Sequence, residues 1–194
     1  MNIYSAFLQN EWKNDRWGIL IGGRLDKHNM VDNVIFSPRA NLRFNPTQNI
    51  NLRLSYSSGF RAPQAFDEDM HIENVGGTVA MIERAKDLKE EKSQSFSASA
   101  DMYHRFGAFQ TNLLIEGFYT RLTDVFVLGE PYDRGDGILV KTRSNGPGAK
   151  VMGLTLEGKV AYLSILQIQA GLTLQRSRYD EPHKWHDDAP AERR

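Results

Sequence analysis

The sequence contains no cysteine among its 194 residues, which excludes a disulfide framework, a thiolate metal site and a cysteine nucleophile. It also lacks a charge excess, because 24 lysines and arginines balance 24 aspartates and glutamates. A nucleic-acid partner is therefore not predicted, since such proteins usually carry a basic surplus. No apolar run approaches the roughly 20 residues of a membrane-spanning helix. The first residues, MNIYSAFLQNEW, have no basic start, apolar stretch or small-residue cleavage site, so any export signal is expected outside this chain.

Catalytic and cofactor motifs are missing as well, including Gly-x-Ser-x-Gly, the phosphate loop and the dinucleotide fingerprint. The chain is therefore predicted not to be an enzyme and not to bind a cofactor. The segment HKWHDD, His183 to Asp188, has two histidines three residues apart, but without a defined helix they do not fix a coordination geometry. The segment DRGDG, Asp133 to Gly137, lacks the closing glutamate of a calcium loop. Both are predicted to be solvated loops, and no metal is predicted.

What the sequence has in abundance is alternation of apolar and polar residues with a period of two, as where Leu52 and Leu54 flank Arg53. Because side chains alternate faces along a strand, each such segment has one apolar and one polar face. Eight strands are predicted, at residues 2–12, 17–27, 38–44, 50–60, 93–104, 109–128, 138–162 and 166–178. The seventh is too long for one regular strand and is expected to break near Gly146-Pro147-Gly148.

The predicted connections alternate between short and long. The short ones are residues 13–16, 45–49, 105–108 and 163–165, and the long ones are 28–37, 61–92, 129–137 and 178–194. In an up-and-down sheet this places all tight turns at one end and all long loops at the other, which is typical of outer-membrane β-barrels. The aromatic residues beside the short turns are expected to form a girdle at one membrane interface. They are Trp12, Trp17, Phe44, Phe106, Phe109 and Tyr162.

Four segments, taken in order, resemble the barrel of TonB-dependent outer-membrane receptors. SPRANLRFNPTQNINLRLSYSSGFRAPQAFDED resembles the family's Ser-Pro-Arg strand, tight turn and Gly-[Phe/Tyr]-Arg-Ala-Pro strand end. LKEEKSQSFSASADMY resembles its Leu-Lys-Pro-Glu-x-Ser strand entry, with Glu90 in place of the proline, and GFYTRLTDVF resembles the strand that follows. RSNGPGAKVMGLTLEGKVAY resembles its glycine-containing strand, with Glu157 in an offset acidic position. The residues that match family motifs are Ser37, Pro38, Arg39, Gly59, Phe60, Arg61, Ala62, Pro63 and Gly153.

The resemblance implies an all-β fold: an antiparallel meander of about eight strands, forming an open part of a transmembrane barrel of about twenty-two strands. It implies one partial barrel domain over residues 1–194, with the plug domain, signal peptide and final strands absent. RAPQAFDEDMHIE is similar to receptors of the Bacteroidota type. The implied setting is the outer membrane of a Gram-negative bacterium. The implied partners are lipid, the receptor's own plug domain, the TonB complex and a nutrient bound by extracellular loops.

By resemblance to the receptor family, residues on the polar faces of the strands are candidates to line the barrel lumen and to contact the plug. They are Arg39, Arg43, Arg53, Asp101, Glu157, Lys159, Gln167 and Gln169. Alternatively, these side chains satisfy one another by salt bridges and hydrogen bonds. The expected function is active import of a large nutrient, such as siderophore-bound iron, haem, cobalamin or a glycan. The rival is a soluble β-barrel or sandwich that binds an apolar ligand internally, because alternation alone does not say which face is outside.

Overall fold

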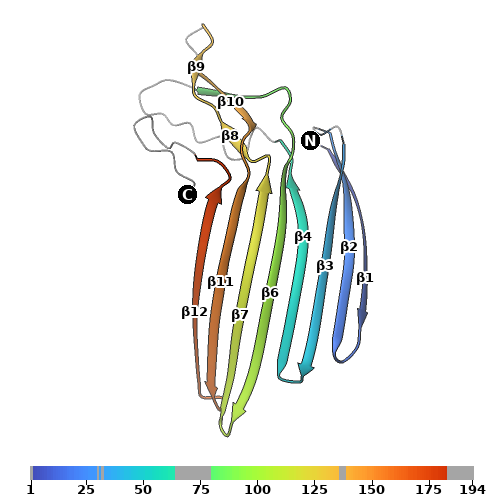
Figure 1. Cartoon of the computed structure of the whole chain (residues 1–194), viewed down its shortest axis with the longest axis vertical. Coiled ribbons are helices and arrows are strands. Elements are labelled where there is room, and N and C mark those ends of the chain that lie inside the picture. Colours follow the sequence, from blue (N-terminus) through green and yellow to red (C-terminus); the bar gives the residue numbers. More distant parts are fainter. Residues whose placement is uncertain (1, 30, 32, 64–79, 136–138, 183–194) are drawn as a thin grey trace.

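A computed structural model of the chain describes residues 2–29, 31, 33–63, 80–135 and 139–182 (Figure 1). The described ranges hold strands and no helix, so none contains a helix long and apolar enough to cross a membrane. Eight strands form one antiparallel sheet in the order β1-β2-β3-β4-β6-β7-β11-β12. Their bounds are β1 Ile3–Lys13, β2 Trp17–His28, β3 Val34–Thr47, β4 Ile50–Arg61, β6 Glu91–Phe106, β7 Phe109–Thr123, β11 Ala149–Tyr162 and β12 Leu166–Tyr179. The predicted meander is confirmed.

The short connections lie together at one end of the main sheet, and the strand ends that lead into the long connections lie at the other, as Figure 1 shows. Local chemistry fixes the tight turns. The Asn14 side-chain oxygen accepts hydrogen bonds from the backbone amides of Arg16 at 2.9 Å and Trp17 at 2.7 Å. Gly107 has a φ of 56°, a left-handed conformation that costs glycine little. The end-to-end asymmetry predicted from the connection lengths is present in the fold.

A second sheet at the loop end was not predicted. It contains β5 Ala80–Arg84, β8 Phe126–Leu128, β9 Tyr132–Asp133 and β10 Leu139–Asn145. β10 pairs in parallel with β5 and antiparallel with β8 and β9.

Two expectations are therefore corrected, and the expected break in the seventh predicted strand is confirmed. Residues 61–92 include a strand, although no sheet pattern was expected there. Residues 109–128 form two strands, because Asp124 adopts a φ of 55° and turns the chain out of the main sheet. Residues 138–162 break at the expected Gly-Pro-Gly, and the first half joins the second sheet.

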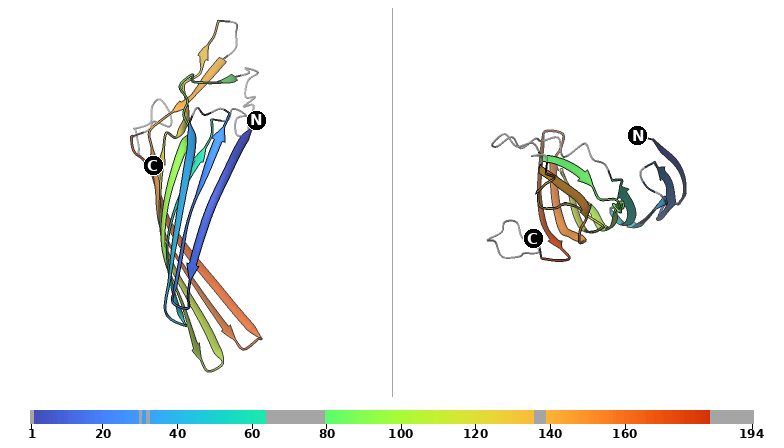
Figure 2. Two further views of the ribbon diagram at one scale, coloured as in Figure 1. Left: turned by 90° about the vertical axis from the view of Figure 1, so that its right-hand side faces the viewer. Right: turned by 90° about the horizontal axis from the view of Figure 1, so that it is seen from above.

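The main sheet is open. β1 and β12 stand at opposite ends of the strand order, and Figure 2 shows a curved, unclosed arc. Few hydrophobic side chains are buried among the described residues: Val31, Ile35, Ala62 and Val140. A closed barrel or sandwich with an internal apolar core, the rival expectation, is thus not what these strands form.

The pairing register gathers apolar side chains on one side of the main sheet, here called the apolar face. One row across it joins Leu42, Leu54, Ala98, Gly117, Leu154 and Leu174. Leu54 is 54% exposed and Leu174 is 61% exposed. Soluble monomers rarely expose continuous apolar patches of this size, so this surface requires an apolar environment.

Candidate functional site

The loop end of the sheet, here called the rim, is built around the motif Gly59 to Pro63 at the end of β4. Phe60 and Ala62 pack with Val31 and Ile35 in a small hydrophobic cluster. The guanidinium of Arg61 lies 5.4 Å from the centre of the Phe126 ring on β8, a cation–π distance. The carbonyl of Pro63 accepts a hydrogen bond from Arg84 Nη1 on β5 at 3.3 Å. The motif therefore fastens β4 to three separate segments at the base of the long loops.

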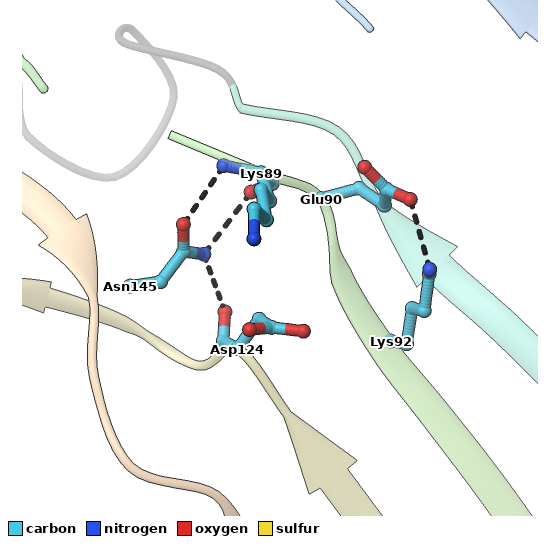
Figure 3. Close-up of polar contacts among 5 residues, drawn as sticks. All are labelled: Lys89, Glu90, Lys92, Asp124 and Asn145. Carbon is cyan, nitrogen blue, oxygen red and sulfur yellow. Dashed lines mark hydrogen bonds and ion pairs between the residues drawn. The ribbon is translucent and has the colours of Figure 1, made fainter. Parts of the chain in front are cut away.

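A second fastening point is the side chain of Asn145, the last residue of β10 (Figure 3). Its Oδ1 accepts from the Lys89 amide at 2.8 Å, and its Nδ2 donates to the carbonyls of Lys89 at 3.1 Å and Asp124 at 2.8 Å. The Gly146 amide donates to the carbonyl of Val125 at 2.7 Å. One amide side chain thus ties the entry to β6, the β7–β8 junction and the β10–β11 break.

Two further polar contacts hold the second sheet over the rim. Arg134 Nη1 lies 2.9 Å from Glu83 Oε1, which joins the residues after β9 to β5. Glu91 Oε2 accepts a hydrogen bond from the Phe126 amide at 3.1 Å, which joins β6 to β8. The described parts of residues 61–92 and 129–137 therefore form one structured unit and are not separate loops.

The polar-face candidates do share one face of the main sheet, here called the polar face. Arg39 Nη2 donates to Gln9 Oε1, and Glu157 accepts from Gln169 Nε2. Asp101 accepts hydrogen bonds from the Tyr103 hydroxyl at 2.9 Å and from Asn112 Nδ2. Lys159 pairs in register with Asn112 and Gln169, and Gln167 pairs with Ala161. Among the candidates, Glu157 and Gln169 thus satisfy one another, whereas Arg39 and Asp101 bond to polar side chains outside the candidate set.

Arg43 and Arg53 differ, because they face each other directly across β3 and β4. Like charges in that position repel. Arg43 lies over Gly18, where an added Cβ would be 3.2 Å from its Nε. Arg53 Nε donates to Asn51 Oδ1 at 2.6 Å. Neither arginine forms an ion pair with any residue in the described ranges.

Two motif residues have packing roles. Ser37 on β3 is buried and lies in register with Arg24 on β2. Gly153 lies under the Phe118 ring, where a Cβ would come within 2.6 Å of Phe118 Cζ and 2.7 Å of the Leu174 carbonyl. A glycine is thus required at 153 by close approach.

The predicted girdle is accompanied by a second aromatic row that the sequence analysis did not identify. Trp17 stacks on Phe44 at a centroid distance of 4.3 Å, and Phe109 packs on Tyr162 at 4.9 Å, both at the turn end. Nearer the rim, one row of the apolar face carries three aromatic residues on neighbouring strands. They are Tyr56, Phe96 and Tyr119.

The spacing of the two rows matches a membrane. On β7 the rows are ten residues apart, from Phe109 to Tyr119. A rise of about 3.4 Å per residue and a tilt of about 40° give a height of about 26 Å. Transmembrane barrels carry an apolar band about 25 Å tall between aromatic girdles. The ten-residue spacing within one strand was the signal available in the sequence.

Two segments considered for metals bear no site that the structure describes. His183 to Asp188 lies outside the described residues, as do the last two residues of the segment Asp133 to Gly137. No group of three or more metal-ligating side chains occurs among the residues that are described.

An open, antiparallel, up-and-down sheet with an apolar face between aromatic rows and structured loops at one end defines a segment of a β-barrel. A family model described as "TonB dependent receptor-like, beta-barrel" matches residues 1–192. The chain belongs to this family. No curated relative matches the sequence.

Solved structures share the fold. The siderophore receptor PirA from Pseudomonas aeruginosa is 18% identical, with a TM-score of 0.74 over 92% of this chain and 35% of that chain. The FrpB iron transporter from Neisseria meningitidis (F3-3 variant) is 18% identical, with a TM-score of 0.67 over 91% of this chain and 26% of that one. The outer membrane transporter YddB from Escherichia coli is 15% identical, with a TM-score of 0.69 over 93% and 25%. The chain thus spans between a quarter and about a third of these structures.

Proposed function

We propose that the chain is a partial barrel domain of a TonB-dependent receptor that imports a large nutrient across the outer membrane of a Gram-negative bacterium. The observation that carries this proposal is the exposed apolar face bounded by two aromatic rows about 26 Å apart. In this arrangement lipid covers the apolar face. The polar face lines the interior, and the protein performs no covalent chemistry.

The interior partner is a plug domain of the same receptor. Arg43 and Arg53 support this proposal, because two opposed guanidinium groups without an ion pair in the described ranges favour a carboxylate from another segment. Energy comes from the TonB complex acting on that plug.

Nutrient recognition belongs to the rim, since loops held by a rigid scaffold commonly carry binding residues. The recognition segments are residues 61–92, 129–137 and 178–194. The cargo is siderophore-bound iron, haem, cobalamin or a glycan; the iron-transporting structural neighbours favour iron.

The test uses the full-length gene in its own host. We expect the receptor to fractionate with the outer membrane and its deletion to abolish growth on one nutrient of a panel of ferric siderophores, haem, cobalamin and glycans. Replacing Glu130 to Arg134 with a Gly-Ser segment should impair rescue, whereas replacing the turn residues Gln48 and Asn49 in the same way should not. Recovery in a soluble fraction would refute the membrane assignment.

A further inference from the structure

The apolar face ends abruptly toward the rim on the three strands β7, β11 and β12. From the turn end, the apolar-face positions of β7 carry no charge until Arg121, and those of β11 carry none until Lys150. On β12 the first charge on this face is Arg176, followed by Arg178. In every case the first charge is positive.

These residues form one cluster, here called the basic row. Arg121 and Arg178 both pair with Lys150 in register, so three cations stand side by side across three strands. Arg176 lies one step nearer the turn end, opposite Met152. Arg121, Arg176 and Arg178 are exposed.

Anions among the described residues neutralise only one member of the basic row. Lys150 Nζ pairs with Asp180 Oδ1 at 2.6 Å, and the three arginines form no ion pair within the described ranges. Adjacent like charges on a sheet repel, so the arrangement costs stability unless an anion lies between them. Arginine matches phosphate particularly well, because its planar guanidinium can donate two parallel hydrogen bonds.

The height of the basic row identifies the anion. Lys150 is twelve residues from Tyr162 along β11, and the same twelve-residue spacing separates Arg121 from Phe109 on β7. At about 3.4 Å per residue and a tilt of about 40°, the row stands about 31 Å above the turn-end girdle. An apolar band about 25 Å tall ends just below it, so the row sits at the level of lipid headgroups. A nutrient would approach from the rim and the interior, not from this outward face.

We propose that Arg121, Lys150, Arg176 and Arg178 bind the phosphate groups of anionic lipid in the leaflet on the loop side of the membrane. This inference rests on the proposed membrane function. The arginines bracket the headgroup phosphates, while the leucines and aromatic residues below them contact the acyl chains.

The test compares two double variants of the full-length receptor that remove equal charge from opposite faces. Arg121→Gln with Arg178→Gln removes half of the basic row, and Arg43→Gln with Arg53→Gln removes two polar-face arginines as the control. Each receptor is reconstituted into vesicles of phosphatidylcholine, with or without a bisphosphorylated lipid A. Co-purified lipid A is then counted by native mass spectrometry. At about fivefold per charge, the loss of two charges should lower lipid A retention by the basic-row variant about 25-fold, and the control should match the wild type.

Several results would overturn the inference. They are equal lipid A retention in all receptors, a loss only in the control, and displacement of lipid A by millimolar inorganic phosphate, which would indicate a site for free phosphate. Failure of any receptor to insert into phosphatidylcholine vesicles would contradict the proposed membrane function instead. The two failures are therefore distinguishable.

Discussion

Replacing Leu156 by arginine, with the neighbouring Thr155→Arg as its partner, tests which face of the sheet meets lipid. Leu156 lies on the apolar face between Ile115 and Leu172 in register. It is six residues from Tyr162, which places it about 16 Å above the turn-end girdle and near the middle of the band. An arginine at the midplane of the lipid face costs about 2–4 kcal/mol.

Thr155→Arg should cost far less. It removes a hydroxyl contact to Thr173 at 3.1 Å, worth about 0.5–1.5 kcal/mol. It also places an arginine directly opposite Glu116, and an opposite-charge cross-strand pair stabilises the fold by about 0.2–1 kcal/mol. Subtracting the small net cost of Thr155→Arg from the lipid-face cost of Leu156→Arg leaves an expected difference in unfolding free energy of about 2 kcal/mol.

The assay is urea unfolding of the full-length receptor refolded into lipid vesicles, and the readout is the midpoint. With a slope of about 2 kcal/mol per molar urea, the urea midpoint of Leu156→Arg should be about 1 M lower than that of Thr155→Arg. Equal midpoints would mean that the two faces are not lipid and interior. The reverse order would mean that the polar face meets the lipid.

The other predictions concern close packing and the rim. Gly153→Ala should destabilise the refolded receptor by about 1–3 kcal/mol, because the new methyl group would clash with the Phe118 ring. Gly158→Ala should leave the urea midpoint nearly unchanged, because no atom lies within 4 Å of the added Cβ. Similar losses of stability in the two variants would refute the packing argument. Asn145→Ala should speed hydrogen exchange at the Lys89 amide about tenfold or more, because the amide loses its acceptor. Asn145→Asp keeps the acceptor and should protect that amide better than alanine does. An unchanged rate in the alanine variant would refute the role of Asn145 as a fastening point.

The main sheet could be predicted because its determinants are local. A period of two assigns strands without knowledge of their partners, and the alternation of connection lengths fixes which ends lie together. Boundaries shifted by a few residues, as where β3 begins at Val34 instead of Pro38. The break at Gly146 to Gly148 was visible because glycine and proline mark it directly.

The second sheet and the Asn145 fastening point could not be predicted in the same way, because their determinants are distant in sequence. β5 is five residues long, and its partner β10 pairs with it in parallel, with Ala80 opposite Leu139. Asn145 reaches the Lys89 amide across 56 residues. The turn at Asp124 depends on a left-handed conformation that aspartate tolerates but does not impose. Each of these features forms only when segments distant in sequence meet at the folded rim, so the residue types alone do not predict it.

The strands are longer than the membrane requires, and this explains where the motif residues fall. β11 has 14 residues, which at about 3.4 Å per residue and a tilt of about 40° reach about 36 Å, well past an apolar band of about 25 Å. In the proposed membrane setting, neither lipid nor the barrel interior dictates which residues above the band are apolar, so the alternation is replaced by specific contacts. Phe60, Arg61 and Asn145 act in this zone, where they join segments that are far apart in sequence. A change in one loop is therefore expected to reach the others through the contacts of the rim, so the rim responds to such a change as one unit.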